Sequence, residues 1–127
     1  MSMPQSRGKA RLGRAITNRG ADQRHRRSLA AYRSGLVRLR QGDTEGGLAQ
    51  LVHAAEIDRR NPELAIEASN ALKASGRLDE ARLLLEVALE ADPRSLVALN
   101  NMGSLCTQRR NYGEAVAYLT RAVEAAP

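Results

Sequence analysis

The sequence predicts an all-α fold in which antiparallel helix pairs are stacked on one another. Three observations predict it: a pattern that recurs every 34 residues, a near absence of aromatic side chains, and glycine or proline at regular breaks between apolar helical stretches. A fixed period of this length is typical of proteins built from repeated supersecondary units. With three tyrosines and no phenylalanine or tryptophan, the core must be built from alanine, leucine and valine, which suits closely packed helices.

A basic extension opens the chain. Residues 1–27 contain eight basic residues and one acid, whereas residues 28–127 contain 12 basic and 13 acidic residues. We expect the extension to be partly disordered or to lengthen the first helix, because nothing between Gln23 and Ser34 breaks a helix. As an electrostatic arm for nucleic acid or an acidic surface it would act through eight side chains: Arg7, Lys9, Arg11, Arg14, Arg19, Arg24, Arg26 and Arg27.

The repeat is defined by residues that return at equivalent positions. The segment GRLDEARLLLEVALEADP (76–93) has one counterpart in RNYGEAVAYLTRAVEAAP (110–127) and another in GDTEGGLAQLVHAAEIDR (42–59). The positions common to all three are Leu51/Leu85/Leu119, Ala54/Ala88/Ala122 and Glu56/Glu90/Glu124. This frame divides residues 28–127 into three units, 28–61, 62–95 and 96–127, each with two helical stretches.

In the first unit, Gly42 is expected to end the first helix, and Asp43 or Thr44 to cap the second. Gly46 and Gly47 lie inside that second helix. Each glycine costs about 1 kcal/mol of helix propensity relative to alanine. The first unit is therefore expected to be the least stable of the three.

The second unit has the clearest boundaries. Asn61 is expected to cap a helix whose first turn holds Pro62, where a missing N–H costs nothing. This helix should end at Gly76, which adopts the left-handed conformation readily. The next helix should begin near Leu78 and stop before Pro93. The third unit repeats this plan as far as the last residue of the sequence given.

Small residues recur where the helices must approach closely. On the first helices these are Gly35, Ser69 and Gly103; on the second helices they are Gly47/Ala81/Ala115 and Ala54/Ala88/Ala122. A larger side chain at such a position would push adjacent helices apart. Leu78, Ala81 and Leu85 also recur at three- and four-residue steps, which is the spacing of one helical face.

The chain offers little chemistry for catalysis or metal binding. Its single cysteine, Cys106, gives no zinc spacing and is expected to pack in the core. His25 and His53 have no partner that would make a catalytic dyad. No apolar run approaches a membrane span, and the N-terminus lacks the apolar segment of a secretory signal. We expect no enzymatic activity, no cofactor and a cytoplasmic location.

Three further motifs point to a known family. The first helices carry the pairs Ser34-Gly35, Ala68-Ser69 and Met102-Gly103; the turns read GRLDEA (76–81) and RNYGEA (110–115); an Ala-x4-Pro ending recurs at 88–93 and 122–127. This pattern resembles the tetratricopeptide repeat over residues 28–127. The resemblance implies a right-handed superhelical stack of three antiparallel helix pairs. It also implies packing roles for Tyr112 and Tyr118.

The resemblance further implies a concave groove, lined by the first helices, that binds a peptide or a partner's helix. The positions that would face it are Tyr32, Arg33, Leu36, Arg40, Glu63, Ile66, Glu67, Asn70, Lys73, Val97, Asn100, Asn101, Ser104 and Gln108. Asn70, Asn100 and Asn101 are the strongest candidates for ligand contact, because an amide both donates and accepts a hydrogen bond. Tyr32 either anchors a ligand or packs against the extension.

Some members of the family bind acidic chaperone C-termini through a clamp of lysine, asparagine and arginine. The matching positions here include Leu36, Glu67 and Val97, which do not form such a clamp. We therefore predict a protein-interaction module without chaperone binding. The alternatives are a substrate-presenting module of a larger glycosyltransferase, sulfotransferase or hydroxylase, a self-associating scaffold, and a nucleic-acid-associated protein.

The last helix has no successor in this sequence to cover it. Stacked repeats need polar capping elements at their ends. An apolar face on this helix is therefore expected to be exposed, with a second copy or another partner as its possible cover. Its expected members are Ala115, Val116, Leu119, Ala122 and Val123.

Overall fold

The computed structural model describes the backbone of residues 3–127 and the side chains of residues 19–127. Every regular element in that part of the chain is an α-helix. The elements are α1 (Met3–Arg40), α2 (Thr44–Ile57), α3 (Pro62–Ala74), α4 (Leu78–Ala91), α5 (Leu96–Gln108) and α6 (Tyr112–Ala125). The predicted all-α fold is thus confirmed.

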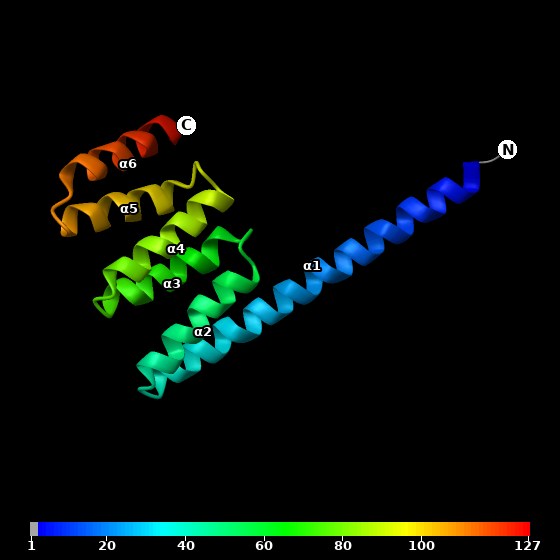
Figure 1. Ribbon diagram of the computed structural model, residues 1–127, viewed down its shortest axis with the longest axis horizontal. Helices are drawn as coiled ribbons and strands as arrows, with labels where there is room; N and C mark the ends of the chain where they lie inside the picture. The colour runs from blue at the N-terminus through cyan, green and yellow to red at the C-terminus, as the bar shows by residue number, and fades with distance from the viewer. Residues whose placement is uncertain (1–2) are drawn as a thin grey trace.

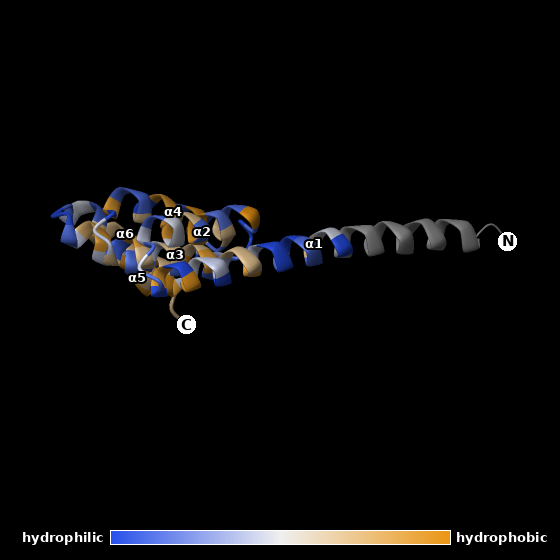
Figure 2. Ribbon diagram, turned by 90° about the horizontal axis from the view of Figure 1, so that it is seen from below, coloured by the Kyte–Doolittle hydropathy of each residue, from blue (hydrophilic) through white to orange (hydrophobic). Residues whose placement is uncertain are grey.

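The helices form three antiparallel pairs, α1 with α2, α3 with α4, and α5 with α6 (Figure 1). Contacts of α2 with α3 and of α4 with α5 join successive pairs into the stack. The part of α1 that projects beyond the stack is hydrophilic over residues 19–27, whereas apolar residues gather in the stacked helices (Figure 2). The core therefore runs continuously through the three pairs.

Most of the predicted caps are present. The Asp43 carboxylate accepts a hydrogen bond from the Gly46 N–H at 3.0 Å, and the Asn61 side chain accepts one from the Glu63 N–H at 3.1 Å. Ser95 does the same for the Ala98 N–H at 3.2 Å. These side chains satisfy donors that the first helical turn leaves unpaired. The helices α2, α3 and α5 therefore begin where local chemistry dictates.

Three turns use the left-handed backbone region at the same position of the repeat. Gly42 has φ +83° and Gly76 has φ +78°, as expected of glycines that end helices. Arg110 has φ +62° and is the non-glycine residue found in this region within the described chain. The third unit therefore keeps the turn geometry with a residue that adopts it at a cost.

Arg110→Gly is expected to raise the free energy of unfolding by about 1 kcal/mol, because glycine removes the clash that a Cβ suffers in this conformation. Urea unfolding followed by far-ultraviolet circular dichroism measures the change. Arg109→Gly is the neighbouring control, since Arg109 has φ −85° and gains no such relief. Equal effects of the two substitutions would contradict the explanation.

The small residues lie where helices cross closely. A Cβ built on Gly35 would lie 2.9 Å from the backbone oxygen of Gly47, and one built on Gly103 would lie 2.7 Å from Leu119 Cδ2. Ser69 and Ala88 are buried at equivalent crossings. The predicted need for small residues is therefore confirmed. Gly47 is also explained, because a Cβ there would lie 2.6 Å from Leu39 Cγ.

Candidate partner-binding face

The predicted groove residues lie on α1, α3 and α5, and their outer surface is called the A face here. Two side-chain contacts connect α3 with α5 on this face. Asn101 Nδ2 donates a hydrogen bond to Asn70 Oδ1 at 3.2 Å. Lys73 Nζ donates one to Ser104 Oγ at 3.2 Å. Four of the residues predicted from the sequence thus form two bridges between successive units.

A hollow of about 340 Å³ lies between the starts of α3 and α5. Its lining is Pro62, Glu63, Ile66, Glu67, Asp92, Ser95 and Val97. Three carboxylates surround an aliphatic surface made by Ile66 and Val97. The repeat pattern places Glu63, Ile66, Glu67 and Val97 on this face, but it misses Pro62, Asp92 and Ser95 because they belong to loops and caps.

Tyr32 connects the first unit to the same region. Its ring is half-buried and packs against the core. Partial burial raises the pKa of the Tyr32 phenol above its usual value, and the negative charge of Glu67 raises it further. Tyr32 therefore stays neutral and lies close enough to Glu67 to sense its charge.

The A face has two rims of opposite charge. Because α1, α3 and α5 run in the same direction (Figure 1), their starts lie at one rim and their ends at the other. Glu63 and Asp92 lie at the rim of the starts, whereas Arg40 and Lys73 lie at the rim of the ends. The other predicted residues, Arg33, Asn100 and Gln108, are exposed side chains on the same three helices. A bound segment would meet the Asn70–Asn101 pair between the rims.

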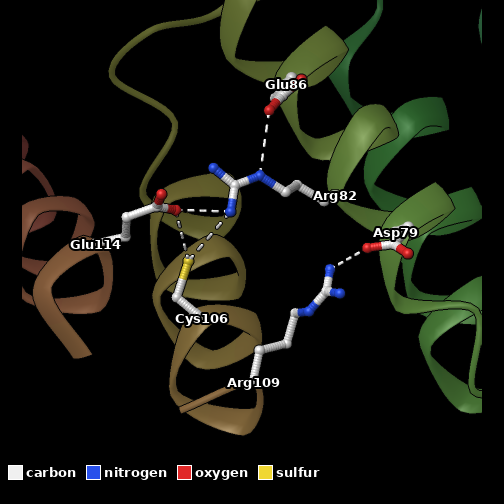
Figure 3. Close-up of polar contacts among 6 residues, drawn as sticks. All are labelled: Asp79, Arg82, Glu86, Cys106, Arg109 and Glu114. Atoms are coloured by element: carbon white, nitrogen blue, oxygen red, sulfur yellow. Dashed lines mark hydrogen bonds and ion pairs between the residues drawn. The ribbon is translucent and has the colours of Figure 1, made fainter. Parts of the chain in front are cut away.

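A second polar cluster joins α4, α5 and α6 (Figure 3). Arg82 Nη1 lies 2.6 Å from Glu114 Oε2, and Arg82 Nε lies 3.3 Å from Glu86 Oε1. The Arg82 guanidinium lowers the pKa of the Glu114 carboxyl below its usual value. Arg109 also pairs with Asp79, which ties α5 to the preceding unit. Sequence reasoning misses the pairs that cross between helices, because no local pattern relates their members.

Cys106 sits beside this cluster without being activated by it. Its sulfur lies 3.7 Å from Glu114 Oε2 and 4.0 Å from Arg82 Nη1 (Figure 3). The side chain is buried, and burial raises the pKa of the thiol. A protonated, buried thiol is a poor nucleophile. Its position agrees with the predicted packing role.

Other kinds of site were also sought in the described residues. No group of three or more histidine, cysteine, aspartate or glutamate side chains there is arranged to hold a metal ion. None of the helices examined in that part has both the length and the apolar character to cross a membrane. Of the predicted electrostatic arm, Arg19, Arg24, Arg26 and Arg27 are exposed on α1. The side chains of Arg7, Lys9, Arg11 and Arg14 lie outside the described residues.

The predicted exposed face of α6 needs correction at two positions. Ala115 and Ala122 are 3% and 6% exposed and belong to the core, because α6 packs on α5 through its small residues. Val116, Leu119 and Val123 are exposed. Tyr112, for which packing was expected, is 60% exposed, whereas Tyr118 packs against the core with Arg121 5.5 Å from its ring.

Comparisons with known proteins agree with this architecture. Two family models, both described as tetratricopeptide repeat, match residues 38–102 and 96–127. No curated protein matches the chain. Similar solved structures include MamA, at a TM-score of 0.68 and 18% identity over 77% of this chain and 57% of that one. The chain thus spans little more than half the length of that relative.

Two further structures are similar and carry a printed mention of peptides. The first TPR of Spaghetti (RPAP3) bound to the HSP90 peptide SRMEEVD has a TM-score of 0.67 and 18% identity, over 80% of this chain and 81% of that one. YrrB, described as a TPR protein with an unusual peptide-binding site, has a TM-score of 0.67 and 25% identity over 79% and 52%.

Proposed function

Because the chain belongs to the tetratricopeptide repeat family, we propose that it is a non-catalytic interaction module whose A face holds an extended peptide segment of a cytoplasmic partner. The observation that carries the proposal is the Asn70–Asn101 pair between two charged rims. The peptide binding printed for the Spaghetti (RPAP3) and YrrB structures supports the same class of function. The groove would act as a preformed surface, so binding would not have to order the receptor.

The amide pair suits a peptide backbone. Each amide has two donor hydrogens and one acceptor oxygen. The mutual hydrogen bond uses one donor of Asn101 and engages the oxygen of Asn70. The Asn70 NH₂ and the Asn101 oxygen remain to pair with a peptide C=O and N–H. Such contacts hold the main chain without selecting its side chains.

The hollow beside this pair would select a basic side chain. The aliphatic stem of a lysine or arginine would lie along Ile66 and Val97, and its charged end would meet Glu63, Glu67 and Asp92. An acidic peptide such as the one in the Spaghetti (RPAP3) structure would be repelled by the same carboxylates. The proposal thus retains the expectation of no chaperone clamp.

Phage-displayed random peptides provide a direct test, with the affinity of each selected peptide measured by calorimetry. Selected peptides are expected to carry lysine or arginine. The double substitution Asn70→Ala with Asn101→Ala is expected to weaken binding by about tenfold or more, because two backbone hydrogen bonds are lost. Glu67→Gln should reduce the preference for a basic residue while leaving the backbone contacts in place.

Gln50→Ala is the matched control, because Gln50 carries the same amide on α2, away from the A face. It should leave the affinity unchanged. Selection of acidic peptides, or equal binding by the Asn70/Asn101 variant and the unaltered protein, would refute the proposal.

A further inference from the structure

The outer side of α6 carries an apolar stripe of four exposed residues. Tyr112 is 60% exposed, Val116 64%, Leu119 41% and Val123 75%. They follow one another at steps of four, three and four residues, so they form one line along the helix. No charged side chain interrupts this line. It is called the α6 stripe below.

The repeat shows what such a line does elsewhere in the molecule. The equivalent positions of α4 are Leu78, Arg82, Leu85 and Leu89. Leu85 and Leu89 are buried and the other two are half-buried, because α5 packs on α4. The α6 stripe therefore continues a helix-binding surface that the stack already uses between its units. Val116 also replaces the charged Arg82, so the stripe is more apolar than its equivalent.

The opposite end of the stack does not offer a matching apolar surface. Buried Leu72 of α3 and Cys106 of α5 lie on the sides that face the preceding unit, beside Val52 and Arg82 respectively. The equivalent residue of α1 is Arg38, which is exposed and pairs with Asp43 at 3.6 Å. Head-to-tail stacking of copies would bury this charge. A second α6 stripe meets no such obstacle.

The stripe is complementary to itself in an antiparallel arrangement. A two-fold axis between Val116 and Leu119 would set Val116 against Leu119 of the second copy, and Tyr112 against Val123. Steps of four, three and four residues are those of alternating core positions in paired helices. The flanking residues Gly113 and Thr120 are small and exposed, so the two helices can approach closely. A two-fold interface of this kind closes on itself.

We propose that two copies of this chain associate through antiparallel packing of their α6 stripes. The interface lies away from the A face and leaves both grooves free, so the inference does not depend on the proposed function. One stripe per copy is smaller than a standard protein interface. The association is therefore weak and depends on protein concentration.

Sedimentation equilibrium from about 5 to about 500 µM tests this, since small interfaces dissociate in this range. The mass of the unaltered chain should rise from that of the 13.8 kDa monomer toward that of a dimer. Val116→Glu should weaken association by at least about tenfold, because it places a charge at the centre of the interface. Leu83→Glu is the control, because Leu83 is an equally exposed apolar residue, at 61%, on α4. It should associate like the unaltered chain.

A mixing experiment tests the register. Tyr112→Glu and Val123→Lys both change highly exposed residues, and circular dichroism would verify that each variant is folded. Each variant alone should associate weakly, whereas their mixture should form a mixed dimer, because the introduced carboxylate of one variant would face the introduced ammonium group of the other. An unaltered chain that stays monomeric to the highest concentration overturns the proposal, as does undiminished association of Val116→Glu. Failure of the mixture to associate overturns the antiparallel register.

Discussion

Leu105→Ala is expected to lower the free energy of unfolding by about 2–5 kcal/mol, the cost of emptying a fully buried leucine site. Leu105 is 0% exposed and lies in α5, which packs against both α4 and α6. Its neighbours in the core are short aliphatic side chains rather than large rings, and helices fixed in a stack cannot collapse into the space. Urea unfolding followed by far-ultraviolet circular dichroism gives the free energy from the midpoint and slope.

Leu83→Ala makes the same chemical change at a position that is 61% exposed. Its effect should stay within about 0.5 kcal/mol, as is usual for exposed sites. A loss at Leu105 no larger than the loss at Leu83 would mean that α5 is not the centre of the core described above. The comparison therefore separates burial from the chemistry of the substitution.

Gly35→Ala should also destabilise the protein, by about 1–3 kcal/mol, although alanine is the better helix former. The added Cβ would lie 2.9 Å from the backbone oxygen of Gly47 and 2.9 Å from Leu51 Cδ2. A backbone oxygen in a neighbouring helix cannot rotate away as a side chain can. The pair α1–α2 would have to separate, which loosens the first unit. The same unfolding experiment measures the loss.

Gly20→Ala is the matched control in the same helix. A Cβ on Gly20 would meet nothing within 4 Å. The substitution gives the same gain in helix propensity without the collision, so no destabilisation is expected. If Gly35→Ala proved as harmless as Gly20→Ala, the close crossing of α1 and α2 would be wrong.

The candidate site shows how far pattern reasoning reaches. The 34-residue frame places Asn70, Asn101, Lys73 and Ser104 on one face from the sequence alone. That these residues pair at 3.2 Å across α3 and α5 follows from the separation and tilt of successive units. Those quantities are set by packing over the whole stack. No local pattern encodes them.

The sequence by itself determined the fold class, the repeat, the helix caps and the close-packed glycines, because these features depend on neighbouring residues and on a strict period. Only the tertiary structure decided which apolar residues of α6 are covered. Ala115 and Ala122 turn toward α5, whereas Tyr112, Val116 and Val123 turn outward. It also decided that Arg82 meets Glu114 and that Arg110 adopts a glycine-like turn. Each of these depends on the direction in which one helix or unit meets the next, and that direction exists only once the units are stacked.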